Sequence, residues 1–320
     1  MAIYKTSQGL RIKSVSSDPS NPIEGQIWYN TTSRQLKVAP KLAGWASGGN
    51  MNTGRRACAS FGIQTAAVTF GGWPGNKTST EEYDGSSWTA GEGMSTGREW
   101  LAGTGTLTAG LGSGGYVTPG ATSVATEEYD GTDWTSSNNL NTTRYSGASA
   151  GTQTAAIHVA GATYNASTNY DNVESYDGSS WTEVGDLNTG RRNIVVFGTQ
   201  AAAIAAGGDP PNLVHTELWN GSSWTEVGDL NSGRNGGAGF GISTSGIYAA
   251  GGTVNTEEWD GSTWTEVSNL ATLRNSSGDS GVGTASLGLI SGGGVPGGDS
   301  VLTGTEEWSL SATVRSVDVS

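Results

Sequence analysis

The feature that most constrains the fold of this chain is a pattern that recurs six times, at intervals of 40 to 47 residues. Each copy begins with an arginine, continues through a pair of small residues, and reaches an acidic and aromatic segment that ends in tryptophan. The first copy contains Arg55, then Gly71 and Gly72, then TEEYDGSSW ending at Trp88. An interval of this length fits one four-stranded propeller blade, so the repeat predicts an all-β fold.

The order of these elements resembles the kelch motif, in which a glycine pair precedes an aromatic residue and then a tryptophan. The Gly-His and Trp-Asp signature of WD40 blades is missing. The resemblance covers residues 43–309 and implies a six-bladed kelch-like β-propeller. It does not imply a function, because one fold can carry both enzymes and binding modules.

The two ends of the repeat array predict how the ring closes. A tryptophan precedes each repeat arginine by ten residues, and the first of these, Trp45, has no blade of its own. The sixth copy ends at Trp308 without a later tryptophan. We therefore expect the N-terminal segment around Trp45 to supply the outer strand of the sixth blade, which removes open sheet edges. The alternative is a seventh, partial blade built from a hairpin at residues 26–38.

This interpretation divides the chain into an N-terminal attachment arm with a small β-hairpin at 1–42, a propeller at 43–309 and a C-terminal tail or strand at 310–320. The tail alternates in polarity, so we expect it to add a strand to a neighbouring molecule or to the last blade.

Six arginines and six glutamates recur at matching positions, and we expect them to form structural ion pairs. One carboxylate for each guanidinium favours pairing over a ring that binds anions. The residues are Arg55, Arg98, Arg144, Arg191, Arg234, Arg274, Glu81, Glu127, Glu174, Glu217, Glu257 and Glu306.

The sequence indicates a protein that is not an enzyme and that holds no metal or cofactor. The DGSSW segments resemble the Asp-boxes of sialidases, but Asp84 lies one residue closer to its tryptophan, and no arginine triad is evident. Copper radical oxidases of the kelch type need two histidine ligands and a crosslinked cysteine. Here His158, His215 and Cys58 belong to separate predicted strands. Adjacent carboxylates on one strand face opposite sides and cannot act together as acid and base.

The segments between the small-residue pair and the next strand vary in length and composition, unlike the turns opposite. They emerge on the same propeller face as the connections between blades, which makes that face the candidate binding surface. Aromatic rings and amides there suit stacking on sugars or contact with a protein. The candidate contact residues are Trp73, Tyr116, Tyr164, Asn165, Asn169 and Tyr170.

Charge and hydropathy exclude two classes of partner. The net charge of −13 repels nucleic acid phosphates and anionic lipids, and no run of basic residues offsets it. No stretch of 18 apolar residues is present, so we expect no membrane insertion. The first twenty residues lack the apolar core of a signal peptide, which predicts synthesis in the cytoplasm.

The segment before the propeller carries a second resemblance. GQIWYNTTS followed by LKV resembles hairpins found in tail-fibre and other virion proteins of tailed phages. This resemblance implies a structural or adhesion component on the tail or capsid surface, made in the host cytoplasm and present in several copies or as a homo-oligomer. Residues 1–42 would contact other virion proteins, and the propeller face would bind a host-surface glycan or protein. A cellular kelch lectin or interaction module is the alternative.

Overall fold

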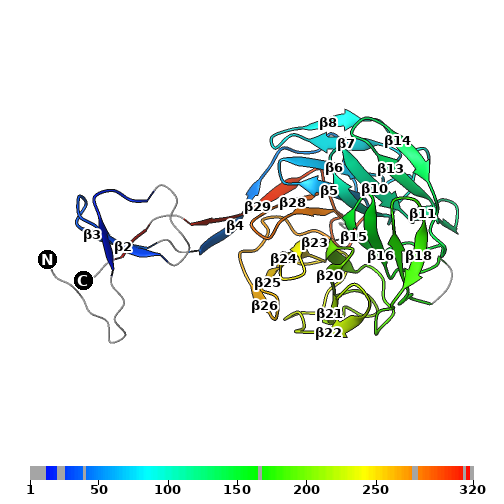
Figure 1. Ribbon diagram of the computed structural model, residues 1–320. Coiled ribbons are helices and arrows are strands. Elements are labelled where there is room, and N and C mark those ends of the chain that lie inside the picture. The colour runs from blue at the N-terminus through cyan, green and yellow to red at the C-terminus, as the bar shows by residue number, and fades with distance from the viewer. Residues whose placement is uncertain are drawn as a thin grey trace. The chain divides into compact units, whose positions relative to one another are not determined.

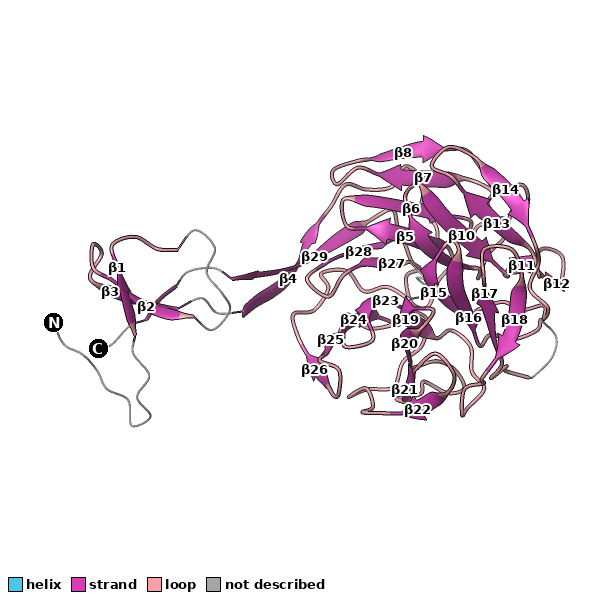
Figure 2. Cartoon of the chain, viewed as in Figure 1, coloured by secondary structure: helices cyan, strands magenta, loops and turns pink. Residues whose placement is uncertain are grey.

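The computed structural model of the chain describes residues 12–19, 26–38, 41–164, 168–275, 280–312 and 315–317. All regular secondary structure in these residues is β-strand (Figure 2). This described part accordingly contains no helix long and apolar enough to cross a membrane. The chain forms two compact units (Figure 1): one takes residues from Met1–Gly44 and Ser309–Ser320, and the other is Trp45–Trp308.

The repeat forms four-stranded sheets, numbered here 1 to 6 in the order of the repeat and given from inner to outer strand. Sheets 1 to 3 are β5 (Ala59–Ile63), β6 (Ala66–Phe70), β7 (Thr80–Tyr83), β8 (Trp88–Gly91); β9 (Ala102–Thr106), β10 (Ala109–Ser113), β13 (Thr126–Tyr129), β14 (Trp134–Ser137); and β15 (Ala148–Thr152), β16 (Ala155–Val159), β17 (Val173–Tyr176), β18 (Trp181–Val184). Sheets 4 to 6 are β19 (Val195–Thr199), β20 (Ala202–Ala206), β21 (Thr216–Trp219), β22 (Trp224–Glu226); β23 (Gly237–Ile242), β24 (Ser245–Ala250), β25 (Thr256–Trp259), β26 (Trp264–Glu266); and β27 (Gly281–Gly283), β28 (Leu287–Ser291), β29 (Thr305–Ala312), β4 (Lys41–Ser47).

The sheets stand around a common centre, with their inner strands adjacent (Figure 1). Contacts between inner strands run from β5 through β9, β15, β19 and β23 to β27, and β27 also contacts β5. The prediction of an all-β propeller fold is therefore confirmed.

A glycine near the end of each inner strand explains the tight turn into the second strand. At Gly62 the backbone has a φ of 115°, which side chains rarely tolerate. A Cβ added there would lie 2.2 Å from the carbonyl oxygen of Ala66. The same arrangement recurs at Gly105, Gly151, Gly198, Gly241 and Gly283.

The DGSSW segment forms the turn between the third and outer strands. In sheet 1, Oδ1 of Asp84 accepts hydrogen bonds from the backbone N–H groups of Ser86 and Ser87, both at 2.8 Å. Gly85 has a φ of 91°, as such a turn requires. The turn brings Tyr83 and Trp88 together, with ring centroids 5.0 Å apart.

The core of the larger unit lies between sheets. One buried cluster joins Ile157 and Val159 of β16 to Val196 of β19 and Trp224 of β22. Small side chains let the inner strands approach closely, while the tryptophans fill the wider gaps farther out. Each sheet is therefore stabilised mainly by its two neighbours.

The smaller unit is a four-stranded sheet in the order β1 (Lys13–Val15), β2 (Ile27–Asn30), β3 (Gln35–Val38) and β30 (Arg315–Val317). Trp28 is fully buried in it, and its indole N–H donates to Asp18 at 3.0 Å. The predicted tail, residues 310–320, is divided: residues 310–312 continue β29 of sheet 6, whereas β30 pairs with β3. Leu36 lies opposite Val317, so a third strand satisfies the edge of the predicted hairpin.

One small sheet was not expected. It consists of β11 (Tyr116–Val117) and β12 (Ala121–Thr122). These strands form a short hairpin inside the variable loop of sheet 2, where they hold Tyr116 in a defined backbone position. No repeat pattern signals this hairpin.

Candidate functional site

The six repeat arginines each form an ion pair with the repeat glutamate of the same sheet. The N–O distances range from 2.7 to 3.1 Å, and no side chain in the set is more than 4 % exposed. The pairs are Arg55–Glu81, Arg98–Glu127, Arg144–Glu174, Arg191–Glu217, Arg234–Glu257 and Arg274–Glu306.

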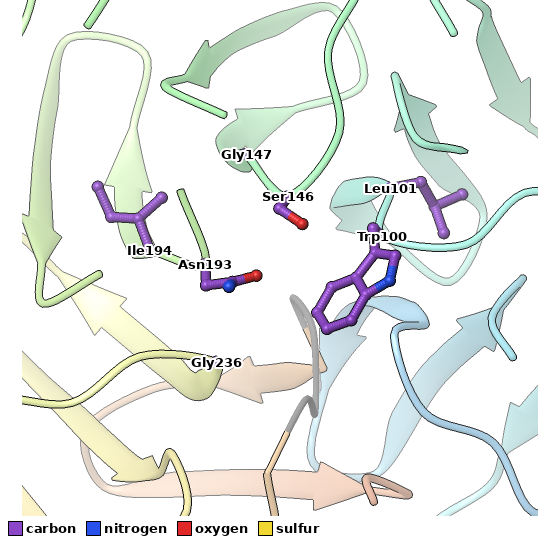
Figure 3. A pocket seen from close by; sticks show the side chains of 7 residues that line it. All are labelled: Trp100, Leu101, Ser146, Gly147, Asn193, Ile194 and Gly236. Carbon is purple, nitrogen blue, oxygen red and sulfur yellow. The ribbon is translucent and has the colours of Figure 1, made fainter. Parts of the chain in front are cut away.

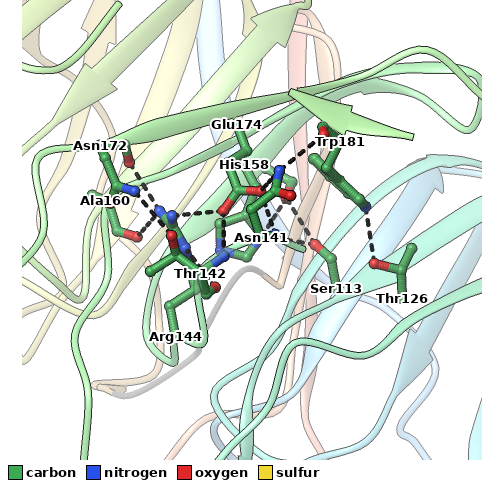
Figure 4. A network of polar contacts seen from close by, with 11 residues as sticks. Ser113, Thr126, Asn141, Thr142, Arg144, His158, Ala160, Asn172, Glu174 and Trp181 are labelled. Atoms are coloured by element: carbon green, nitrogen blue, oxygen red, sulfur yellow. Dashed lines mark hydrogen bonds and ion pairs between the residues drawn. The ribbon is translucent and has the colours of Figure 1, made fainter. Parts of the chain in front are cut away.

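The surroundings of Arg144 show why these charges do not form a ligand site (Figure 4). Its Nη1 donates to the carbonyl oxygens of Ala160 and Asn172, and Nη2 donates to Oε1 of Glu174 at 2.8 Å. Glu174 also accepts from the backbone N–H groups of Asn141 and Thr142. Burial lowers the pKa of Arg144, and the Glu174 carboxylate opposes that shift. The pair fixes the loop that enters each sheet.

The second acidic residue of the repeat serves the next sheet. Tyr83 donates its hydroxyl to Glu307 at 2.5 Å, and Tyr176 donates to Glu128 at 2.6 Å. Tyr129 likewise donates to Glu82. Burial raises the pKa of Tyr83 and of Tyr176, each to about 12, so both hydroxyls keep their protons. The two carboxylates of one strand thus face different partners.

A ring of indole N–H groups joins neighbouring sheets. Trp88 donates to Thr305 of sheet 6 at 3.0 Å, and Trp134 donates to Thr80 of sheet 1 at 2.9 Å. Trp45 continues the series by donating to Thr256 at 3.0 Å. Further bonds of this kind join Trp181 to Thr126 and Trp264 to Thr216.

The tryptophan that begins the outer strand of sheet 4, Trp224, is the exception. The indole N–H of Trp224 is buried, and no acceptor for it lies in the part of the chain that the structure describes. The position that carries threonine in the other sheets is occupied by Val173 in sheet 3. A single substitution in the repeat therefore removes one of the contacts between sheets.

The residues that follow the repeat arginines make short backbone bridges to the variable loops. Arg56 pairs with Trp73, Glu99 with Tyr116, and Arg192 with Asp209. Directly opposite residues of an antiparallel bridge project their side chains to the same side. The guanidinium of Arg56 accordingly lies 4.2 Å from the Trp73 ring centroid, and Arg192 lies 2.9 Å from Oδ2 of Asp209.

The loops of sheets 2 and 3 bring three tyrosines together. The rings of Tyr116 and Tyr164 have centroids 4.6 Å apart and are inclined at 43°. Tyr145 lies with its centroid 6.3 Å from that of Tyr116. Tyr164 is 45 % exposed, so part of this aromatic surface faces solvent. We call Tyr116, Tyr145 and Tyr164 the tyrosine cluster.

Glu99 lies beside this cluster. It is 8 % exposed, and its backbone N–H donates to the carbonyl oxygen of Tyr116 at 3.0 Å. Among the described residues none donates a hydrogen bond to its carboxylate. Burial raises the pKa of Glu99, and the positive charge of Arg56 opposes that shift.

The remaining predicted contact residues do not join the cluster. Trp73 packs under Arg56 on sheet 1. Asn169 bridges to Ala162, and its side-chain N–H donates weakly to the Asp209 carbonyl at 3.4 Å. Tyr170 lies 5.6 Å from the guanidinium of Arg144 and accepts from Arg191 through its backbone. Asn165 lies outside the described residues.

The sequence pattern does not predict Glu99 and Tyr145 as site residues, because both lie outside the loops within each repeat. Both stand one position after a repeat arginine, where the repeat varies freely between arginine, glutamate, tyrosine and asparagine. An alignment of the six repeats on that position shows a second set of variable residues, in addition to the loops.

The residue two positions after the repeat arginine lines the mouth of the central channel in sheets 2 to 5. Trp100, Ser146 and Asn193 have φ values of 54°, 56° and 51°. Their backbones form a chain of hydrogen bonds between sheets, in which Trp100 donates to Ala57, Ser146 to Trp100, Asn193 to Ser146, and Gly236 to Asn193, at 2.7 to 2.9 Å. This belt fixes the spacing of the inner strands.

Figure 3 shows the small cavity beside these backbone bonds, which the Asn193 and Ser146 side chains and the Trp100 ring surround. Its volume is about 10 Å³, which is near the smallest space that holds a water molecule. Oδ1 of Asn193 is buried there, and none of the described residues donates a hydrogen bond to it. The cavity is too small for a ligand.

A larger cavity of about 120 Å³ lies at the far end of the inner strands. It is lined by residues 60–62, 103–105, 149–151, 196–198, 239–241 and 281–283. Most of these residues are glycine or have small side chains, so the surface offers little chemistry besides backbone groups.

The histidines and the cysteine are placed separately. Nδ1 of His158 lies 2.7 Å from the Ser113 hydroxyl between sheets, and burial lowers the pKa of His158 well below its usual value. Cys58 is buried, which raises its pKa to about 11. His215 lies 3.8 Å from the Glu226 carboxylate. In the part of the chain that the structure describes, no three His, Cys, Asp or Glu side chains are grouped as metal ligands.

Comparison with known proteins assigns the fold and nothing more. No protein-family model matches the chain, and no curated protein matches its sequence. Among solved structures the chain is similar to that of YjhT, with a TM-score of 0.67 and 13 % identity, over 82 % of this chain and 99 % of that one. In all, 291 chains of solved structures match. Identity this low supports a shared β-propeller fold alone.

Proposed function

We propose that this protein is a non-enzymatic adhesion component of a tailed-phage virion, exposed on the tail or capsid surface, which binds a host-surface molecule through the loop face of its propeller. The observation that carries the proposal is the contrast between repeated and unrepeated residues. The repeated charges and rings are used within the scaffold. The residues after the repeat arginines and the loops that they bridge vary from copy to copy, and the tyrosine cluster and Glu99 belong to this variable set.

We infer a six-bladed propeller of kelch type that is closed by β4. Three observations support this: the strand order of sheet 6 ends in β4, Trp45 donates to Thr256, and Trp88 donates to Thr305. With β4 as its outer strand, sheet 6 covers the edge of β29, and a closed ring gives the loop face a rigid base.

The absence of catalysis is supported by how the carboxylates are used. The first glutamate of each repeat is held by an arginine, and three of the second ones accept a tyrosine hydroxyl. Glu99 lies opposite Tyr116 in a backbone bridge, and no second carboxylate is seen beside the tyrosine cluster among the described residues, whereas the usual glycosidase mechanism needs two carboxyl groups flanking the scissile bond.

The virion assignment rests on the resemblance of the N-terminal hairpin to tailed-phage proteins. In the smaller unit Asn30 accepts hydrogen bonds from the N–H groups of Thr32 and Ser33, which gives the NTTS segment its turn. This unit would attach the propeller to other virion proteins through residues 1–42, in several copies or as a homo-oligomer.

The test is a cryo-electron microscopy map of the particle that carries this chain, combined with adsorption assays. We expect residues 1–42 to be buried against other virion proteins and the loop face to point outward. Purified protein should compete with particles for adsorption to host cells. If the chain is missing from purified particles and instead stays with cellular glycans, it is a cellular lectin. Release of sugar from host glycans by the purified protein would make it an enzyme.

A further inference from the structure

We propose that Glu99 and the tyrosine cluster form a binding site for an uncharged pyranose of a surface glycan. The proposal rests on the proposed adhesion function and specifies the ligand class and the site. It follows from three properties of the loop face: an acid without a donor, arginines that are already paired, and an aromatic surface.

The first property concerns Glu99. In the equivalent bridges of sheets 1 and 4 the two facing side chains satisfy each other, as Arg56 does with Trp73 and Arg192 with Asp209. In sheet 2 the bridge places a carboxylate opposite a tyrosine, and no donor to that carboxylate lies among the described residues. A nearly buried carboxylate gains strongly from hydroxyl donors, because charge-assisted hydrogen bonds are about twice as strong as neutral ones. Adjacent sugar hydroxyls supply such donors.

The second property concerns charge. Arg56 pairs with Asp299 at 3.1 Å, and Arg192 pairs with Asp209 at 2.9 Å. Each arginine thus already has a carboxylate partner with which an acidic ligand would compete, and Glu99 repels such a ligand directly. The net charge of −13 acts in the same direction at longer range. A sugar that carries carboxylate, phosphate or sulfate is disfavoured.

The third property concerns shape. Tyr116 and Tyr164 come from different sheets, and their inclined rings form a shallow surface that stays partly exposed. The hydroxyl of Tyr116 accepts a hydrogen bond from the backbone N–H of Gly120 at 3.0 Å, which holds this ring in place. A pyranose has one apolar face of C–H groups that packs on such rings, and equatorial hydroxyls at its edge that reach a neighbouring acid.

The experiment measures binding of the full chain to an array of neutral hexose oligosaccharides, each matched with the same backbone carrying a uronate or a phosphate. Tyr164→Ala should weaken binding to the neutral sugars about tenfold, by loss of a stacking ring. Glu99→Gln should weaken it by about tenfold or more, and should reduce the discrimination against the uronate members. A structural defect would weaken binding to the neutral and the uronate sugars alike, and would leave the discrimination between them unchanged.

The matched controls are Tyr29→Ala and Glu183→Gln, which alter exposed residues elsewhere on the chain and should leave binding unchanged. Equal binding of all variants would overturn the proposal, as would a preference for the anionic sugars or no binding to any neutral sugar. If host-cell adsorption is lost after protease treatment but survives periodate oxidation of glycans, the ligand is a protein. In that case this site assignment fails while the adhesion function stands. Absence of the chain from particles would refute the adhesion function itself, whatever the array shows.

Discussion

At the residue scale, the buried ion pairs set how the protein responds to substitution. Arg144 and Glu174 are both fully buried, and each holds other hydrogen bonds besides the pair. Removing one partner leaves an uncompensated buried charge, so we expect Glu174→Ala to lower the free energy of unfolding by about 3–5 kcal/mol. Arg144→Ala should cost a similar amount, and the double variant should cost clearly less than the sum.

Denaturant unfolding of the four proteins measures these values. The pair Arg192–Asp209 is the matched control, because its side chains are 33 % and 23 % exposed. Breaking it should cost no more than about 1 kcal/mol. Additive effects at Arg144 and Glu174 would show that the two groups do not depend on each other.

The exception at Val173 gives a second residue-scale prediction. Threonine stands at this position in the other five sheets and accepts the indole N–H of a tryptophan in the neighbouring sheet. The Trp224 N–H has no acceptor among the described residues. Val173→Thr should supply the missing acceptor at nearly the same size and raise the free energy of unfolding by about 1 kcal/mol. Thermal and denaturant unfolding measure the change, with Thr126→Val as the reverse control. A loss of stability in Val173→Thr would mean that the buried hydroxyl costs more than the bond returns.

At the element scale, the turn between the third and outer strands links sequence to acid stability. The backbone and serine hydrogen bonds to Asp84 lower the pKa of that carboxyl to about 2, and the same holds for Asp177 and Asp260 in the equivalent turns. Sheet 4 has Asn220 instead, and its Oδ1 accepts the corresponding bonds from Ser222 and Ser223. Asparagine therefore keeps the turn without a titrating group.

These lowered pKa values fix the sign of the pH dependence. A carboxyl with a folded pKa of about 2 and an unfolded pKa of about 3.9 stabilises the fold above pH 4, and this contribution is lost as the pH falls toward 2. The triple variant Asp84→Asn, Asp177→Asn, Asp260→Asn should therefore be less stable than the natural protein at pH 6, and the difference should vanish by about pH 2. Tryptophan fluorescence during denaturant unfolding at each pH measures it. A constant difference across this range would refute the role of ionisation.

The repeated elements could be predicted from the sequence, and the unrepeated ones could not. The predicted segments ACASFG and TAAVTFGG coincide with most of β5 and with all of β6, because glycine positions and alternation recur in every copy. The hairpin β11–β12 and the pairing of β30 with β3 occur once, so no periodicity reports them. Of the candidate site, the sequence predicts Tyr116 and Tyr164, because they are aromatic residues in variable loops. It does not predict Glu99, because the role of Glu99 depends on which residue lies opposite it in the folded backbone.

At the scale of the whole molecule, the last sheet of the repeat contains a strand from the other end of the sequence, β4. Within the larger unit, Trp45 packs with its ring centroid 5.4 Å from Trp308 and 6.2 Å from Phe240, and its N–H donates to Thr256. Trp134 has the corresponding place in sheet 2, with centroids 4.7 Å from Phe70 and 6.0 Å from Phe61.

If β4 closes the ring, Trp45→Ala should be as damaging as Trp134→Ala, at about 3–5 kcal/mol in each case, because both remove a large ring and an indole hydrogen bond between sheets. The two variants should differ in their tendency to aggregate on heating. Loss of Trp45 loosens the strand that protects the edge of β29, so transient opening should expose that edge and promote aggregation on heating. In the Trp134 variant the strand is covalently continuous with its own sheet, and reversible unfolding should persist. Denaturant unfolding and light scattering during heating separate these outcomes. A Trp45 variant as stable as the natural protein would mean that the propeller holds together without its N-terminal strand.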